Sequence, residues 1–147
     1  MSIRARVLMT TAAVAVALLT SGWAQAEAEF KLRWGHYLGK GPFLEMEQKF
    51  ARTIEKRTGG RVKIDITFAG GLGKGNETMT LAGRGAIDIA AAPPSYYGDQ
   101  LLFWKAFQVP FIFTEPKQAM MVLAKSLKEF PVYMQEMDKM NVIWLFQ

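Results

Sequence analysis

The 147-residue chain contains no cysteine and a single histidine, His36. The lack of cysteine excludes disulfide bonds, thiolate metal sites, a thiol nucleophile and lipid attachment to an N-terminal cysteine. One histidine is too few for a metal site built from several imidazoles. Hydrophobic residues make up 50% of the chain and charged residues 21%, which is typical of a folded domain. The scarcity of catalytic side chains favours a binding protein over an enzyme, and we expect neither a metal nor a cofactor.

The first 26 residues have the three-part pattern of a secretory signal peptide. Arg4 and Arg6 give a positive start, residues 7–20 are mostly apolar, and residues 24–26 (Ala-Gln-Ala) form a small-x-small cleavage site. The apolar run is shorter than the roughly 20 residues that a transmembrane helix needs. We therefore expect export, cleavage after Ala26 or alternatively two residues later after Ala28, and no membrane-spanning segment once the leader is removed.

Removal of the leader also changes the charge of the 121 residues that remain. The net charge falls from +5 to +3, because the leader contains Arg4 and Arg6 but no acidic residue. The remaining cations are dispersed, with the densest cluster at residues 56–63. Nucleic-acid binding usually needs a concentrated basic face, so we interpret these charges as a solvated surface and expect no nucleic-acid partner.

Strand-like and helix-like segments alternate after the leader. Residues that alternate between polar and apolar, or short apolar runs, predict strands at 31–35, 61–68, 86–91 and 142–146, with an extended segment at 109–113. Apolar residues spaced by three and four predict helices at 42–58, 77–84, 99–107, 114–129 and 132–140, with Asn76 as the cap of the second. This order predicts an α/β fold with a mostly parallel sheet flanked by helices.

The glycine-rich turn at residues 69–75 invites comparison with phosphate-binding loops. A phosphate loop requires Ser or Thr after its Gly-Lys pair, whereas Gly73-Lys74 is followed by Gly75. The dinucleotide pattern fails as well, because its third glycine is replaced by Asn76. We interpret the turn as a strand-to-helix connection with unusual backbone angles, and the alternative is an anion site on the next helix.

His36 has no diagnostic catalytic partner nearby in the sequence. Ser95 is the only conceivable nucleophile for it, which leaves a small secreted α/β hydrolase-like enzyme as one alternative function. A stand-alone binding module is a second alternative function. Seven aromatic residues crowd the segment 96–113, and they form either core or a stacking surface for a ligand.

Four segments together resemble the extracytoplasmic substrate-binding proteins of TRAP transporters, the DctP-like family. They are LRWGHYLGKGP (32–42), FARTIEKRTGGRVKIDITFAGGLG (50–73), GRGAIDIAAA (83–92) and VPFIF (109–113). The resemblance implies a periplasmic-binding-protein-like fold and a location in the periplasm. It also implies a small organic acid, a carboxylate, as the ligand, which would be delivered to membrane subunits for uptake driven by an ion gradient.

The resemblance further implies that residues 27–147 form only the N-terminal lobe of a two-lobed protein, truncated in the strand that crosses between the lobes. The family's signature arginine, which pairs with the ligand carboxylate, would follow that strand, so we expect weak or lost acid binding. We also expect exposed apolar surface and poor solubility. Gly71 in place of the usual glutamine and Pro93 in place of a polar contact are departures that bear on the ligand's identity.

Ligand contacts in two-lobed α/β binding proteins gather where the parallel strands end. In this sequence those ends lie at 36–37, 69–70 and 92–96. We expect Tyr37 and Tyr96 to form hydrogen-bonding or stacking walls, with His36 and Ser95 as supporting contacts. No residue is assigned a catalytic role.

Overall fold

The computed structural model describes residues 28–145. The predicted signal peptide and its first cleavage site lie outside this range, as do Phe146 and Gln147 at the other end. Among the described residues, no helix is both long enough and apolar enough to cross a membrane.

Three parallel strands form the sheet, in the order β2-β1-β3. The central strand β1 (Phe30–His36) pairs with β2 (Val62–Thr67) over most of its length. The third strand, β3 (Ile89–Ala91), pairs only with the last three residues of β1. The predicted parallel α/β sheet is therefore confirmed, and β3 is an edge strand with one side unoccupied by any described strand.

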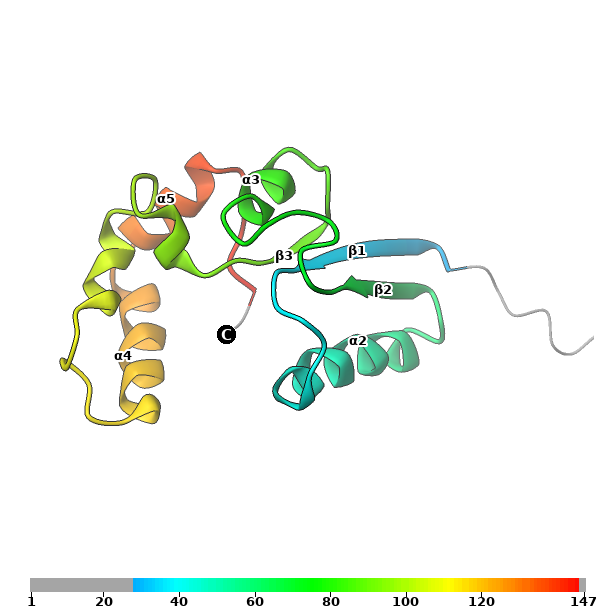
Figure 1. Ribbon diagram of the computed structural model, residues 1–147, viewed down its shortest axis with the longest axis horizontal. Helices are drawn as coiled ribbons and strands as arrows, with labels where there is room; N and C mark the ends of the chain where they lie inside the picture. The colour runs from blue at the N-terminus through cyan, green and yellow to red at the C-terminus, as the bar shows by residue number, and fades with distance from the viewer. Residues whose placement is uncertain (1–27, 146–147) are drawn as a thin grey trace, which may run out of the picture.

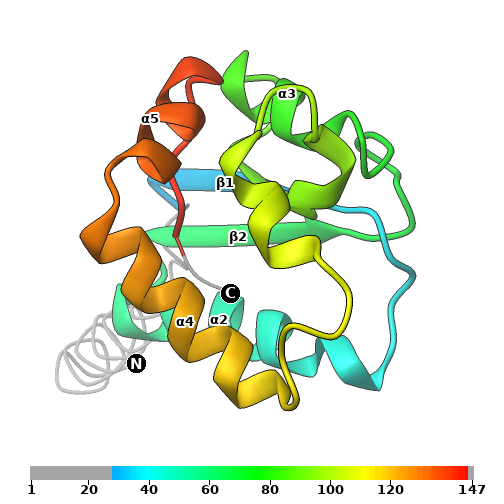
Figure 2. The same ribbon diagram turned by 90° about the vertical axis from the view of Figure 1, so that its left-hand side faces the viewer.

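Helices cover both faces of this sheet (Figure 1). After a short 3-10 turn (Pro42–Leu44), α2 (Glu45–Arg57) connects β1 to β2 on one face, and α3 (Thr78–Gly83) connects β2 to β3 on the other. Beyond β3, the 3-10 segments η2 (Pro94–Tyr97) and η3 (Phe103–Gln108) lead into α4 (Pro116–Glu129) and α5 (Val132–Lys139). Figure 2 shows that α4 and α5 follow one another along the side of the molecule where the last described residues lie.

The amphipathic pattern of α2 explains its placement. Its first turn carries Glu45 and Glu47 and its last turn Lys56 and Arg57, which match the partial charges at the two helix ends. Gly59 and its neighbour follow the helix with φ angles of 61° and 84°, as a left-handed helix end requires. The helix packs mainly on β2, and its Phe50 ring meets that of Trp34 in β1 edge to face at 6.3 Å.

Tyr97, Trp104 and Tyr133 belong to a buried core, which we call the aromatic core cluster. It unites α3, η2, η3 and α5 through Met79, Tyr97, Leu101, Trp104, Tyr133 and Met137. Trp104 lies at its centre, with ring centroids 5.7 Å from Tyr133 and 4.8 Å from Trp144. Within the segment 96–113, the interpretation as core is confirmed for Tyr97, Trp104 and Phe107. Tyr96, Phe103 and Phe111 are exposed.

The predicted strand at 142–146 is wrong over its described part. Residues 142–145 have no regular secondary structure, and Phe146 lies outside the described residues. The amide of Val142 donates to the carbonyl of Met137 at 3.2 Å, so the chain here still completes the turn that ends α5. A strand requires a ladder of hydrogen bonds with a neighbour, and no hydrogen bond in the described backbone joins this segment to β3.

Three further predictions fail in detail. Asn76 does not cap α3, because Glu77 occupies the cap position and its carboxylate accepts from the amide of Lys74 at 2.9 Å. The segment at 109–113 is a turn and not extended, since Phe111 has a φ of 64°. The helix expected at 99–107 begins later, at Phe103, where the buried carboxylate of Glu136 accepts from the backbone amide.

Candidate functional site

Three of the four predicted ligand contacts meet at the carboxyl edge of the sheet. His36 is the last residue of β1, Tyr37 follows it, and Tyr96 lies in η2, just beyond β3. The ring of Tyr37 stacks on that of His36 at 5.5 Å with an interplanar angle of 7°. It meets Tyr96 edge to face at 5.9 Å. We call His36, Tyr37 and Tyr96 the aromatic row.

The imidazole of His36 is held in one neutral form. The side chain is only 3% exposed, and its Nδ1 accepts from the amide of Leu38 at 3.1 Å. With Nδ1 as acceptor, the neutral ring carries its proton on Nε2 and can donate from there. Burial lowers the pKa of His36 below its ordinary value of 6.5, and the nearby Glu47 carboxylate opposes this effect more weakly.

We expect the imidazole to titrate below pH 6.5, which the single histidine of the chain makes simple to follow by NMR. The unfolded chain takes up this proton first as the pH falls, so the contribution of the buried neutral ring is complete above pH 6.5 and decreases below it. Urea unfolding across this range should show a steeper loss of stability than in His36→Asn. A pKa at or above 6.5 would contradict the burial described here.

Tyr37 of the aromatic row presents a neutral hydroxyl group. Burial raises the pKa of Tyr37 above 10, and Tyr96 adds to this shift, so the hydroxyl stays protonated at neutral pH. The side chain of Tyr96 is 54% exposed. The row therefore offers hydroxyl groups that donate or accept, together with ring surface for stacking.

The glycine-rich turn lies directly against this row. A Cβ atom placed on Gly75 would come within 2.6 Å of the Tyr96 ring and 3.3 Å of the Tyr37 Cβ. The turn is also tied to the end of β1, because the amide of Gly70 donates to the carbonyl of His36 at 3.0 Å. Gly70 has a φ of 72°, which agrees with a connection that needs unusual backbone angles.

Ser95 lies apart from the other predicted contacts. It lines a hollow of about 210 Å³ beside the aromatic core cluster, whereas His36 lines a different and larger cavity. In a 3-10 segment, successive residues are about 120° apart, so Ser95 and its neighbour Tyr96 leave η2 in different directions. The structure therefore does not bring together a serine–histidine pair.

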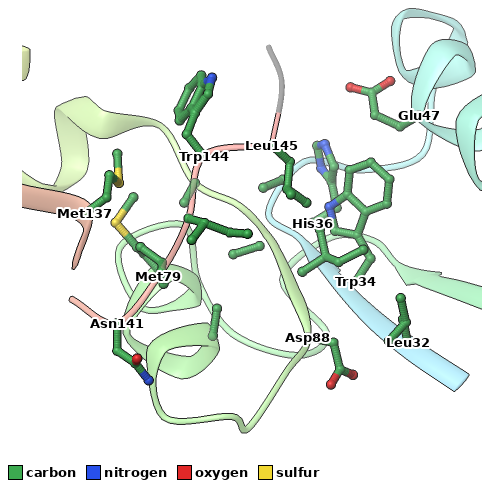
Figure 3. Close-up of a pocket in the computed structure, with 17 residues that line it drawn as sticks. Leu32, Trp34, His36, Glu47, Met79, Asp88, Met137, Asn141, Trp144 and Leu145 are labelled. Carbon is green, nitrogen blue, oxygen red and sulfur yellow. The ribbon is translucent and has the colours of Figure 1, made fainter. Parts of the chain in front are cut away.

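The larger cavity, of about 560 Å³, was not predicted (Figure 3). β1 contributes Trp34 and His36, and the segment from Asn141 to Leu145 forms the opposite wall. Glu47 of α2 also reaches it, and its Oε2 is a buried atom with no hydrogen-bond partner among the described residues. The sequence pattern placed Glu47 among the charged positions of α2, which gave no signal that it faces inward. Within residues 28–145, no three His, Cys, Asp or Glu side chains gather as a possible metal site.

Comparison with solved structures identifies this fold. DctP7 of Bordetella pertussis, an extracytoplasmic solute receptor binding pyroglutamic acid, matches 79% of this chain with a TM-score of 0.69 and 18% identity. A TRAP periplasmic solute-binding protein of Roseobacter denitrificans with bound β-D-glucuronate matches 73%, with a TM-score of 0.64 and 23% identity. One from Sulfurospirillum deleyianum with bound succinate matches 76%, with a TM-score of 0.62 and 22% identity.

In each case the chain spans a minor part of the solved protein: 38%, 36% and 36% of their respective lengths. A search of functionally curated proteins finds no match. The family model that describes bacterial extracellular solute-binding proteins of family 7, DctP, matches residues 40–145. That match includes α2, β2, β3 and the aromatic core cluster, and it covers well over half of the chain. The chain therefore belongs to the DctP family of bacterial extracellular solute-binding proteins.

Proposed function

We propose that residues 27–147 are the N-terminal lobe of a periplasmic receptor that captures a small organic acid for a TRAP transporter and delivers it to membrane subunits. The family match over residues 40–145 carries this proposal. The three solved proteins named above bind pyroglutamic acid, glucuronate and succinate, which are all carboxylates. The protein acts by binding and release, without a chemical step. Export through the predicted leader, cleaved after Ala26 or Ala28, would place it in the periplasm.

The aromatic row is the best-supported solute contact surface in the described residues. It lies at the carboxyl edge of a parallel sheet, where α/β binding proteins place their ligands. The row supplies Nε2 of His36 and the hydroxyl groups of Tyr37 and Tyr96, but these three residues supply no positive charge. We therefore expect the row to orient a solute, while the charge of the carboxylate is matched by a cation from outside the row.

Closure around the solute would supply that cation. Ligand binding shifts a two-lobed receptor from an open to a closed state, and a second lobe can then add an arginine to a carboxylate held on the first. Two charge-assisted hydrogen bonds contribute about 1.5–3 kcal/mol each. Without them, a dissociation constant that would otherwise be about 1 μM rises to about 0.2 mM or weaker.

NMR titration of the chain with succinate, glucuronate and pyroglutamate tests this function. We expect dissociation constants of about 0.2 mM or weaker, with the largest shifts at His36, Tyr37 and Tyr96. Succinamide, which lacks the charges, serves as the control ligand. Micromolar binding to this chain alone would contradict the role of an external cation. Shifts at saturating carboxylate that leave the row unaffected would contradict the row as the contact surface.

Gly75→Ala should weaken this binding without unfolding the chain. The new Cβ would overlap the ring of Tyr96, which must then move away from Tyr37. We expect the carboxylate-induced shifts to decrease at least about threefold at fixed ligand, because about 1 kcal/mol of contact is lost. Gly39→Ala is the matched control, since a Cβ there meets no atom within 4 Å. Equal carboxylate binding by both variants would show that the spacing of Tyr37 and Tyr96 does not affect binding.

A further inference from the structure

The hydroxyl group of Tyr97 joins the aromatic core cluster to the glycine-rich turn. The residue is 2% exposed and belongs to that cluster. Its hydroxyl donates to the carbonyl of Gly75 and accepts from the amide of Met79, both at 2.9 Å. Because a phenolic hydroxyl has one proton to donate, these two short bonds use its donor and fix its position on the turn and on α3 at once.

A second buried hydroxyl group lies beside the same carbonyl. Thr78 is 0% exposed, and its Oγ1 lies 3.4 Å from the carbonyl oxygen of Gly75 and 3.3 Å from that of Ala91 at the end of β3. The single proton of this hydroxyl serves one of the two carbonyls at a time. The carbonyl of Gly75 thus faces two donors, and the shorter bond comes from Tyr97.

Gly75 is the part of the turn against which the aromatic row packs. It is buried, and a Cβ atom on it would come within 2.6 Å of the Tyr96 ring and 3.3 Å of the Tyr37 Cβ. Tyr96 directly precedes Tyr97 in η2. The segment η2 therefore holds Gly75 at two places, with one tyrosine ring against its Cα and the next tyrosine's hydroxyl on its carbonyl. A displacement of Gly75 would change the spacing of the two tyrosines of the row.

We propose that Tyr97, assisted by Thr78, is a positioning residue for the aromatic row. Its hydroxyl keeps Gly75 where this glycine sets the spacing of Tyr37 and Tyr96. The inference rests on the proposed function, and it adds a buried residue that makes no contact with the solute. Without the hydroxyl, the buried carbonyl of Gly75 loses its nearest donor, and the turn shifts to recover one. A contact surface needs such support from behind to keep its side chains in one arrangement.

Tyr97→Phe removes this hydroxyl and keeps the ring in the core. Tyr133→Phe is the matched control, because it removes a tyrosine hydroxyl from the same cluster. None of the hydrogen bonds within residues 28–145 joins the hydroxyl of Tyr133 to the glycine-rich turn. In NMR spectra, the nuclear Overhauser effect between the rings of Tyr37 and Tyr96 should lose intensity in Tyr97→Phe and stay unchanged in Tyr133→Phe.

Succinate binding, followed in the same spectra, measures the effect on the solute. We expect the dissociation constant to rise at least about threefold in Tyr97→Phe and to stay unchanged in Tyr133→Phe. A weaker ring contact together with weaker binding, in Tyr97→Phe alone, supports the assignment. An unchanged ring contact, an equal change in both variants, or a lost ring contact with unchanged binding overturns it.

Two further variants keep the test decisive should Tyr97→Phe fail to fold. Thr78→Val removes the second hydroxyl and should also weaken the ring contact, whereas Thr78→Ser retains the hydroxyl and should restore it. An unchanged ring contact in Thr78→Val then overturns the proposal. If the unmodified chain binds no succinate, the proposed function fails, and the ring contact alone still tests whether Tyr97 positions the row. The two failures are therefore distinguishable.

Discussion

Replacement of Trp104 by alanine should lower the free energy of unfolding by about 3–5 kcal/mol. The side chain is only 2% exposed and lies at the centre of the aromatic core cluster. It contacts Tyr133 and Trp144, and its Nε1 donates to the carbonyl of Tyr133 at 3.4 Å. Removing the ring leaves a cavity that joins η3, α5 and the terminal segment, residues 141–145, and the packed neighbours can fill it only in part. A loss of this size is a large fraction of the 5–15 kcal/mol typical of a domain.

The urea midpoint, followed by circular dichroism at 222 nm, measures this loss. Phe111→Ala is the matched control, because that aromatic side chain is 100% exposed and its removal should change stability by less than about 0.5 kcal/mol. Trp104→Phe should fall between the two, since it keeps part of the ring volume. A loss of less than about 1 kcal/mol for Trp104→Ala would show that the cluster is not the core of this part of the chain.

Gly83→Ala should destabilise the chain by about 1–3 kcal/mol although it places a better helix former in α3. A Cβ at this position would overlap the carbonyl oxygen of Met140. The same turn is held by Asn141, whose Nδ2 donates to the carbonyl of Gly83 at 2.7 Å while its own φ is 56°. The glycine is thus needed because the backbone after α5 lies directly on the last turn of α3.

Helix propensity alone predicts that Gly83→Ala raises the free energy of unfolding by about 1 kcal/mol. The sign of the measured change therefore distinguishes overlap with Met140 from helix propensity. Urea unfolding of Gly83→Ala beside the open-site control Gly39→Ala measures it. The overlap should also displace the start of the terminal segment, so the near-ultraviolet circular dichroism, to which Trp144 contributes, should decrease. A stabilised Gly83→Ala variant would contradict the close contact between α3 and the turn at Met140.

The elements that could be predicted from sequence are those with strong local signals. α2 and β2 follow from clear periodicity. Gly59 and Gly60, which lie between these two elements, mark the end of α2. The terminal strand could not be predicted correctly, because alternation reports which side chains face inward and not whether a neighbouring strand supplies hydrogen bonds. Residues 142–145 keep the alternation without the ladder. Asn76 failed as a cap because α3 begins one residue later than predicted and the amide of Met79 donates to the hydroxyl of Tyr97 at 2.9 Å.

The candidate site, too, could be predicted from the sequence only in part. His36, Tyr37 and Tyr96 could be predicted to meet, since the carboxyl ends of parallel strands share one edge of the sheet. Their roles in solute binding stay predictions. Ser95 could not be excluded from sequence, because its direction depends on the 3-10 geometry of η2 and not on its distance along the chain. The inward position of Glu47 depends on a cavity formed by residues nearly a hundred positions later, which no local pattern reports.

The short pairing of β3 has a consequence for partial unfolding of the molecule. Only three residues of β3 join the sheet, whereas β2 is bonded along most of β1. The β1–α2–β2 unit is therefore hydrogen-bonded within itself. The later helices are attached to it through α3 and through the three-residue pairing of β3 with β1. Opening events of intermediate free energy should release η3, α4 and α5 together while the first unit stays closed. Such partial opening would make the short pairing of β3 the place where motion between these two parts of the molecule begins.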